Sequence, residues 1–354
     1  MIKKLILYQS AVLFLVSILI SGCAGKSAKD VELYWPLPPD EPRIKWVGWI
    51  RGEQDVREET AGEKFLKAVL GEESRFTRLK KPYGVHARDG RIYVSDTLAG
   101  KVAVFDLAKK KFFYLGTSGA GVLSKPIGIA TDAAGYIYVT DTNQDRAIVY
   151  EHNGTFSHAL GEKDQFEQPG GIAVNDTLNR IYVVDIKRHH VQVFNRQGQY
   201  LFQFGKRGPE DGEFNFPINI FIDNEGKVYV SDSMNFRVQM FDADGNFLSK
   251  FGSLGDAPSQ FARPKGVAVD SEGHIYVVDA AFNNVQIFDS EGQLLLFFGE
   301  MGTGPGGFWL PAGMFIDEND KIYVADQYNR RINIFQYMGE KYRKSLEQAE
   351  EAEQ

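Results

Sequence analysis

The stretch DSMNFRVQMFDADGNFLSKFG (Asp232–Gly252) returns with few changes as DAAFNNVQIFDSEGQLLLFFG (Asp279–Gly299). Both copies begin with an aspartate that is followed nine residues later by a phenylalanine, and the chain holds six such aspartate–aromatic pairs. The pairs are Asp96 and Phe105, Asp141 and Tyr150, Asp185 and Phe194, Asp232 and Phe241, Asp279 and Phe288, and Asp326 and Phe335. The prolines that precede the pairs lie 43 to 48 residues apart, at Pro82, Pro126, Pro169, Pro217, Pro264 and Pro311. Self-similarity at this period predicts a repeat architecture.

One repeat contains four short apolar segments separated by turns rich in Asp, Asn and Gly. In the fifth copy these segments are Arg263–Asp270, His274–Asp279, Val285–Asp289 and Leu294–Gly299. Segments of this length with such turns are typical of antiparallel hairpins, and they leave no room for a crossover helix. Six such sheets bury both their faces when they pack around a common axis. The sequence therefore predicts an all-β fold, a six-bladed β-propeller of four-stranded antiparallel blades.

Small residues near the start of each repeat support this interpretation. The second residue after the proline is glycine in five copies and asparagine in the fourth: Gly84, Gly128, Gly171, Asn219, Gly266 and Gly313. Innermost strands crowd together near a propeller axis, so glycine at one register indicates the close approach of a neighbouring sheet. An ordinary β-sandwich does not explain a sixfold register.

The repeats resemble those of the NHL family. The nearest matches to its hallmark are Asn235–Arg237–Gln239–Phe241 and Asn329–Arg331–Ile332–Phe335, and the resemblance covers Lys81 to Met338. The first copy is the most divergent, and His190 and Asn284 stand where arginine is usual. The resemblance implies a propeller but no single function, because one such fold hosts many functions.

The chain opens with MIKKLILYQSAVLFLVSILISGCAGKS, which is typical of a bacterial lipoprotein signal peptide. Two lysines precede an apolar stretch that is short for a spanning helix, and ISGC (Ile20–Cys23) resembles a lipobox. The alternative is an uncleaved anchor with an incidental cysteine. Because Cys23 is the one cysteine of the chain, we expect lipidation at Cys23, and Ala24 favours the outer membrane if the cell has one. The expected location is the cell envelope.

Composition limits the partners. A single cysteine excludes an intramolecular disulfide, and the absence of a C-x-x-C-H motif excludes covalently attached c-type haem. The formal net charge of −7 is unsuited to nucleic acid, which requires a basic surface. We expect no cofactor, no metal and no nucleic acid, and a protein or peptide partner in the envelope.

Segments outside the repeats complete the expected organisation. Residues 1–22 are the signal peptide, 23–42 the lipidated cysteine with a proline-rich tether, 43–80 a closing strand with an amphipathic helix, 81–338 the repeats, and 339–354 a charged helical tail. The last repeat lacks a fourth strand, so we predict that Arg43–Ile50 supplies it beside Arg331–Phe335. The helix, within Thr60–Glu73, begins after a capping threonine, and we expect its apolar face to pack over the propeller.

Two groups of candidate binding residues follow from propeller geometry. The loops between the second and third strands and the linkers between blades share one face, which we call the loop rim. The candidate rim residues are Arg146, Arg188, His189, His190, Arg237, Trp309 and Arg331. Inner-strand positions that are small in other repeats carry the candidate channel-lining residues His86, Asn219, Phe221 and Phe315. The opposite face is expected to consist of tight turns such as DNEG at Asp223–Gly226.

These observations favour a lipid-anchored propeller that acts as a protein-binding or peptide-binding or scaffolding module. The repeat aspartates are expected to cap their own loops rather than to form a ring of ligands. The alternative is an envelope enzyme of the lyase or lactonase kind with its site at the channel mouth. An enzyme is the less favoured of the two, because the histidines do not come with a neighbouring acid/base partner that departs from the repeat pattern.

Overall fold

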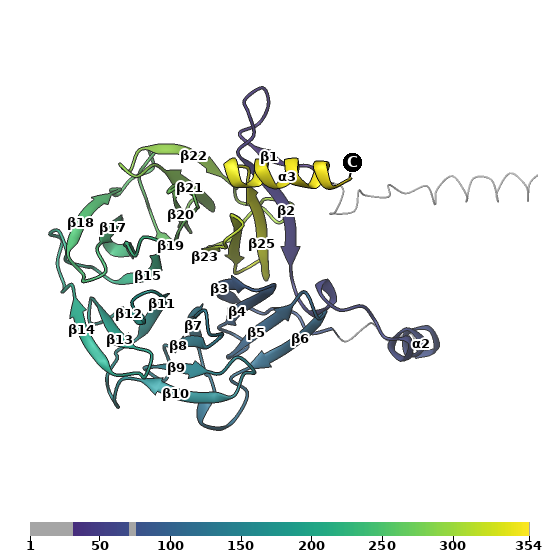
Figure 1. Ribbon diagram of the computed structural model, residues 1–354, viewed down its shortest axis with the longest axis horizontal. Coiled ribbons are helices and arrows are strands. Elements are labelled where there is room, and N and C mark those ends of the chain that lie inside the picture. The colour runs from purple at the N-terminus through teal and green to yellow at the C-terminus, as the bar shows by residue number, and fades with distance from the viewer. Residues whose placement is uncertain (1–30, 71–75, 354) are drawn as a thin grey trace, which may run out of the picture. The chain divides into compact units, whose positions relative to one another are not determined.

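The structure, a computed structural model, describes residues 31–70 and 76–353. The predicted signal peptide and Cys23 lie outside these residues. The unit Leu33–Gln354 contains one five-stranded and five four-stranded sheets. The sheets follow one another around a central channel in chain order, as the colours in Figure 1 show. The six-bladed β-propeller predicted from the repeats is confirmed.

Each of the first five blades is an antiparallel meander whose first strand lies nearest the channel, and in the last blade β23 (Pro311–Ile316) lies there (Figure 1). The first three blades consist of β3 (Pro82–Arg88), β4 (Arg91–Asp96), β5 (Lys101–Asp106) and β6 (Lys111–Leu115); β7 (Pro126–Thr131), β8 (Ile137–Asp141), β9 (Arg146–Tyr150) and β10 (Phe156–Leu160); and β11 (Pro169–Asn175), β12 (Arg180–Asp185), β13 (His190–Asn195) and β14 (Tyr200–Phe204). The next two consist of β15 (Pro217–Ile222), β16 (Val228–Asp232), β17 (Arg237–Phe241) and β18 (Phe247–Phe251); and β19 (Pro264–Val269), β20 (Ile275–Asp279), β21 (Asn284–Phe288) and β22 (Leu294–Phe298). The last blade consists of β1 (Tyr34–Trp35), β2 (Ile44–Ile50), β23 (Pro311–Ile316), β24 (Lys321–Asp326) and β25 (Arg331–Tyr337).

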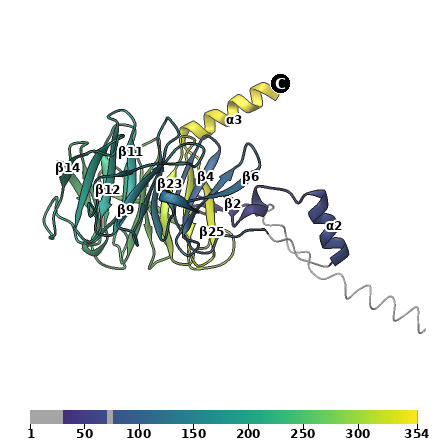
Figure 2. The same cartoon turned by 90° about the horizontal axis from the view of Figure 1, so that it is seen from below.

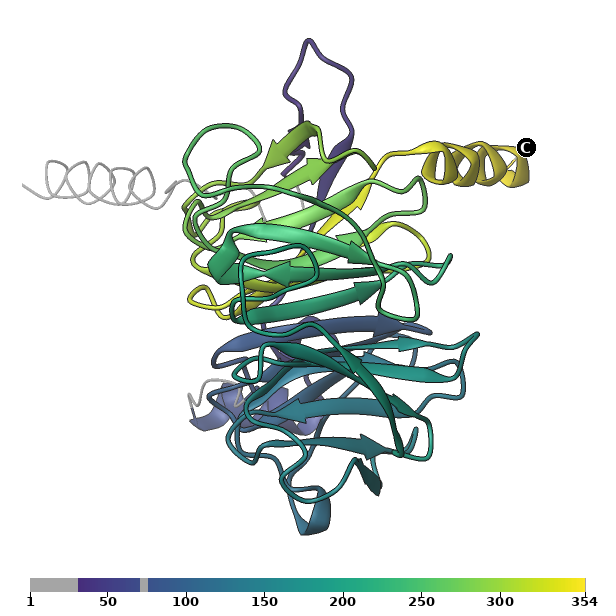
Figure 3. The ribbon, with the colours of Figure 1, turned by 90° about the vertical axis from the view of Figure 1, so that its left-hand side faces the viewer.

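Helical segments are few in the described part of the chain. Two α-helices, α2 (Ala61–Leu70) and α3 (Glu340–Glu353), and the short 3₁₀ turns η2 (Glu53–Asp55), η3 (Gly119–Gly121) and η4 (Ser233–Asn235) lie outside the blades' strands. The strands run between two faces of the propeller, as the side views show (Figures 2 and 3). Within residues 31–70 and 76–353, no helix is long and apolar enough to cross a membrane.

The core lies between neighbouring blades, where aromatic rings from the linkers hold one sheet to the next. Phe214, in the linker from β14 to β15, is fully buried between Phe204 of one blade and Phe241 of the next, with ring centroids 6.4 and 5.5 Å away. Phe261 and Phe308 occupy the same register and are equally buried. Face-to-face packing of this kind buries apolar surface that a single four-stranded sheet would leave in water.

The inner-strand glycines are required by close approach. A Cβ atom at Gly128 would lie 2.4 Å from the carbonyl oxygen of Gly170, and one at Gly84 would lie 2.3 Å from that of Ile127. Both distances are shorter than any van der Waals contact. Asn219 fits at the equivalent position of the fourth blade, where its Oδ1 accepts a hydrogen bond from the Ile220 N–H at 2.8 Å.

The ring closes with a strand from the start of the chain, as the sequence predicts. β2 pairs antiparallel with β25, from Ile44 opposite Tyr337 to Ile50 opposite Ile332. The structure also corrects the expected tether, because Tyr34 and Trp35 form a fifth strand on β2. The Trp35 ring lies 5.8 Å from both Phe298 and Phe335, so this part of the expected tether is packed against the last two blades.

Helix α2 begins where the sequence predicts but does not pack as expected. Thr60 and Glu63 form a reciprocal cap: the Glu63 N–H donates to Thr60 Oγ1 at 3.3 Å and the Glu63 carboxylate accepts the Thr60 N–H at 2.7 Å. Phe65, Val69 and Leu70 are 66%, 61% and 60% exposed. The expectation that this apolar face packs over the propeller was therefore wrong for these three side chains.

Candidate binding site

The repeat aspartates are structural. All six are fully buried, and each accepts a hydrogen bond from a backbone N–H just before the proline of its own repeat. Asp279, for example, accepts the N–H groups of Ala262 and Ala281, both at 2.8 Å. These aspartates therefore join the blade linker to the loop that follows the second strand, in addition to capping that loop. Burial outweighs the hydrogen bonds at Asp185 and raises the pKa of its carboxyl to about 6.

Two of the candidate rim arginines point into the protein. The side chains of Arg237 and Arg331 are 7% and 4% exposed, and their Nε atoms lie 2.8 Å and 2.9 Å from buried Asp232 and Asp326. Arg331 also donates to the carbonyl oxygens of the preceding linker at Thr303, Gly304 and Gly307. These arginines hold linkers to blades, and their charge is not presented at the surface.

Arg146 and Arg188 perform the same task nearer to solvent. Arg146 donates to the carbonyl oxygens of Ala120 and Val122 at 3.1 and 2.6 Å. Arg188 donates to those of Gln165 and Asp164 at 2.7 and 3.0 Å, and its side chain is 38% exposed. Satisfying linker carbonyls is a structural function that the rim position alone does not reveal.

The two candidate rim histidines are buried. His189 Nδ1 accepts the Phe216 N–H at 3.1 Å, and the two rings meet edge to face 4.6 Å apart. Asp145 and Asn283 bind the equivalent N–H groups in other blades, so the register could have revealed this role. His190 occupies the position of Arg237 and Arg331, and burial lowers its pKa to about 4, which keeps it neutral at physiological pH.

Trp309 is the one candidate rim residue whose ring forms an exposed surface. It is 42% exposed and stacks on Tyr328, itself 49% exposed, with ring centroids 5.6 Å apart. Lys81 Nζ lies 5.4 Å from the Tyr328 ring centre. Eight exposed apolar side chains of the described residues lie in loops and linkers of the same face, at Leu98, Val122, Phe216, Met234, Leu254, Met301, Trp309 and Tyr328.

The rim end of the channel holds a basic group that sequence reasoning did not single out. Lys265 follows the proline of the fifth repeat and Tyr83 that of the first, and Lys265 Nζ lies 5.4 Å from the Tyr83 ring centre. Burial, together with the nearby charges of Arg263 and Lys81, lowers the pKa of Lys265 to about 8. The signal available in the sequence was the register: the residue after the repeat proline is uncharged in the other five copies and is lysine in the fifth.

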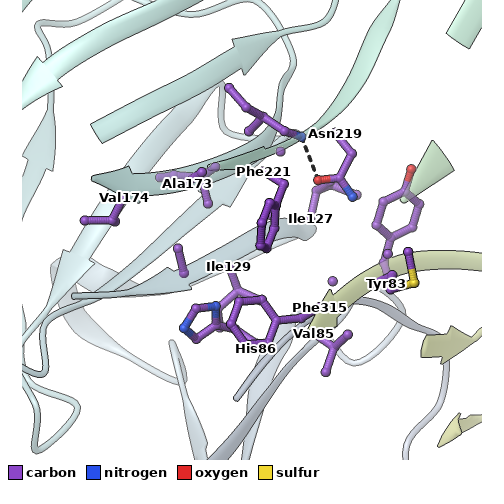
Figure 4. A pocket seen from close by; sticks show the side chains of 18 of the residues that line it. Tyr83, Val85, His86, Ile127, Ile129, Ala173, Val174, Asn219, Phe221 and Phe315 are labelled. Atoms are coloured by element: carbon purple, nitrogen blue, oxygen red, sulfur yellow. Dashed lines mark hydrogen bonds between the residues drawn. The ribbon is translucent and has the colours of Figure 1, made fainter. Parts of the chain in front are cut away.

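The candidate channel-lining residues His86, Asn219, Phe221 and Phe315 all line a narrow central cavity of about 80 Å³. Figure 4 shows the His86 and Phe315 rings against one another, with Phe221 pointing toward them. The ring centroids of His86 and Phe315 are 4.0 Å apart, and His86 Nε2 lies 3.0 Å from Thr131 Oγ1. Burial lowers the pKa of His86 to about 3, so its ring is neutral and held in place.

The opposite end of the channel opens into a larger, acidic depression of about 440 Å³. Tight turns between the first and second strands form its wall, as the sequence predicts for this face. Carboxylates of Asp176, Asp223, Glu225, Asp270, Asp317, Glu318 and Asp320 outnumber the cations Arg88 and Lys341. Among residues 31–70 and 76–353, no group of three His, Cys, Asp or Glu side chains is placed to hold a metal ion.

Comparison with protein families gives one match that covers more than half of the chain. The family model DUF5128, described as a 6-bladed beta-propeller, matches residues 163–250, 223–281 and 269–348. Among curated proteins, the protein brain tumor of Drosophila melanogaster is 38% identical over 58 residues, which are 16% of this chain. The chain covers 6% of the length of that protein.

Solved structures share the fold at low sequence identity. A streptogramin B lyase has a TM-score of 0.56 and 13% identity, over 72% of this chain and 93% of that chain. An auxiliary nutrient binding protein from Bacteroides thetaiotaomicron has a TM-score of 0.57 and 15% identity, over 74% of this chain and 70% of that chain. Likeness at such identities shows the fold alone.

Proposed function

We propose that this chain, which belongs to the DUF5128 family of six-bladed β-propellers, is an envelope-anchored module that binds a protein or peptide at its loop rim. The observation that carries the proposal is the uneven distribution of exposed apolar side chains. Eight large ones lie in rim loops and linkers, whereas the turns of the opposite face carry three, Leu107, Tyr136 and Leu178. Grouped exposed apolar side chains on a soluble fold are typical of interaction surfaces.

The Trp309–Tyr328 pair is the proposed anchor of this surface. Tryptophan and tyrosine are enriched among the residues that contribute most to binding, because they supply large contact area with few rotatable bonds. The rings lie on the framework of the last blade: Trp309 donates its backbone N–H to Asp326 at 2.8 Å, and Tyr328 donates its own to the Trp309 carbonyl at 3.2 Å. A rigid anchor loses little conformational entropy on binding.

The resemblance to NHL repeats and the lipobox-like segment supply the finer part of the proposal. A rigid ring of blades whose rim loops differ from one another suits the docking of a macromolecule, and Cys23 would hold the propeller at the membrane. The neutral, ring-packed His86 gives no support to the alternative of an envelope lyase or lactonase. A binding module is the function that the described residues support best.

Replacing both Trp309 and Tyr328 with alanine should reduce partner recovery from envelope membranes by tenfold or more. Loss of about 1.4 kcal/mol of binding free energy is sufficient for that factor, and a hot-spot aromatic contributes at least that much. Recovery is measured by crosslinking and quantitative mass spectrometry with the full-length protein as bait. The matched control replaces Tyr136 and Leu178, which are 38% and 44% exposed on the opposite face. If the control variant loses partners and the rim variant keeps them, the binding face has been assigned to the wrong side.

Cys23→Ser should release the protein from the membrane fraction or leave an uncleaved precursor. A single acyl chain binds membranes marginally, at about 0.8 kcal/mol for each buried methylene, and several chains on one cysteine anchor firmly. Fractionation with intact-mass measurement checks this outcome. Retention of the variant in the membrane at the mature mass would show that Cys23 is not the anchor.

A further inference from the structure

Three cationic side chains at the rim end of the channel lie close enough for two of them to lower the pKa of the third, and none is in an ion pair with a carboxylate of the described residues. Lys265 is the second residue of β19, Arg263 precedes that strand, and Lys81 precedes β3 of the first blade. None of these three takes part in an ion pair with any residue of the described ranges, although most other described arginines and several lysines do. The grouping is therefore not explained by the internal salt bridges of the fold.

A short residue in the sixth blade allows the Lys265 side chain to extend past that blade to the first. The residue that follows the proline is bulky in the first, second and fourth repeats, at Tyr83, Ile127 and Ile218, but it is Ala312 in the sixth. Ala312 is fully buried and short. The Lys265 side chain accordingly reaches Tyr83, which lies two blades further around the propeller. Lys265 Nζ lies 5.4 Å from the centre of the Tyr83 ring. Tyr83 itself lines the channel cavity, so the ammonium group lies at the cavity's rim end.

The carboxylate that acts electrostatically on Lys265 already accepts hydrogen bonds from the backbone. Asp279, on β20, favours the charged form of Lys265, but its oxygens accept the backbone N–H groups of Ala262, Arg263 and Ala281. Burial and the charges of Arg263 and Lys81 act in the opposite direction and lower the pKa of Lys265 to about 8. A half-buried ammonium near two other cations is electrostatically unfavourable, and an anion bound between them would reduce that penalty.

The surroundings indicate which anion fits. The Tyr83 ring forms one wall, and Lys81 joins the group to the exposed Tyr328 ring, on which Trp309 stacks. An aromatic platform next to this group of cations suits a ligand in which an apolar side chain lies a few bonds from one negative group. A long polyanion is disfavoured by the net charge of −7. A carboxylate carried by a peptide satisfies both features.

We propose that Lys265, Arg263 and Lys81 bind a peptide carboxylate at the rim end of the channel, with the adjacent side chain of the peptide resting on the Trp309–Tyr328 pair. The carboxylate belongs either to the C-terminus of a partner or to an acidic side chain. The proposal rests on the rim-binding function above and names the chemistry that the rim recognises.

Calorimetric titration with short peptides tests this directly. The probes are acetyl-Ala-Ala-Phe with a free carboxylate, the same peptide as its amide, and the amidated peptide acetyl-Ala-Asp-Phe; the purified full-length protein is the receptor. We expect the free acid to bind at least tenfold more tightly than its amide. Tight binding of the aspartyl peptide as well would assign an acidic side chain, and its failure to bind would assign a C-terminus. Inorganic phosphate is titrated in parallel, and phosphate binding with no preference for the acid over the amide would overturn the proposal.

Variants of Lys265 make the test specific. Lys265→Met should reduce affinity for the acid at least tenfold and leave affinity for the amide unchanged. The matched control is Lys187→Met, on the opposite side of the same rim, where the lysine lies 3.7 Å from Glu167. Equal effects of the two substitutions on binding of the acid would contradict the assignment.

The pH dependence of binding distinguishes a lysine that contacts the carboxylate from one with a purely structural role, which would not change it. The pKa of Lys265 is lowered, so its positive charge is present below pH 8 and is lost as the pH rises through about 8. The affinity for the acid should fall as the pH rises through about 8. The other groups that face Lys265 are Arg263, Lys81, Asp279 and Tyr83, and burial raises the pKa of Tyr83 to about 12. Lys265→Arg should remove this fall, since arginine stays charged.

Two outcomes separate this inference from the proposed function. Loss of envelope partners in the Trp309/Tyr328 variant with no effect of Lys265→Met on any probe would leave the rim function standing and overturn the carboxylate site. Discrimination between acid and amide that depends on Lys265, without any rim-dependent partner, would establish the site and reject the docking function.

Discussion

Arg331→Met should lower the free energy of unfolding by about 3–5 kcal/mol, which is the typical effect of removing one partner of a buried ion pair. The substitution leaves the fully buried Asp326 without its cation and removes the guanidinium hydrogen bonds to the carbonyl oxygens of Thr303, Gly304 and Gly307. It also removes the guanidinium that lies 4.4 Å from the Trp49 ring centre on the closing strand. Urea unfolding followed by tryptophan fluorescence measures the change.

Arg188→Met is the matched control, because Arg188 makes analogous linker contacts with a side chain that is 38% exposed. Hydrogen bonds near solvent contribute about 1 kcal/mol, so the control should lose far less. Equal losses would show that burial of the Asp326–Arg331 pair is not what holds the last blade. The rim arginine Arg237 belongs with Arg331, so charge reversal at Arg237 tests folding rather than partner binding.

Trp46→Ala should destabilise the protein by about 3–5 kcal/mol and promote aggregation. Trp46 is 3% exposed, lies opposite Phe335 on β25, and packs against Trp49 at a centroid distance of 5.2 Å. Weakening β2 exposes the backbone edge of β25, which can then pair with another chain. Urea unfolding and light scattering on heating measure the two effects.

Val47→Ala is the control for Trp46→Ala, since the neighbouring Val47 is 51% exposed. Exposed substitutions away from special features change stability by about 0.5 kcal/mol or less. A Trp46 variant as stable and as soluble as the Val47 variant would mean that ring closure by the N-terminal strand contributes little.

For the rim residues, the sequence predicted the face of the propeller but not the direction of the side chains. The repeat register placed Arg146, Arg188, Arg237 and Arg331 on the correct face, but the direction of each side chain depends on a linker about two dozen residues away. The guanidinium group is exposed to solvent or donates to a carbonyl oxygen depending on how that linker packs over it. Similarly, His189 reaches the N–H of Phe216 only because two blades are stacked. The pattern of residues within one strand contains no such information.

Periodicity by itself determined the propeller, the strands of the fifth blade to within one residue, and the source of the closing strand. These features depend on interactions within one repeat, or on a missing strand that the pattern makes visible. Only the tertiary structure decided that α2 presents Phe65 and Val69 to solvent, that Trp35 packs on the last blades, and that Lys265 meets Tyr83. Lys265 and Tyr83 are far apart in the sequence, in the fifth and the first repeat. They become neighbours because a closed propeller places its first and fifth blades on either side of the sixth. Such contacts follow from closure, and closure is a property of the whole chain.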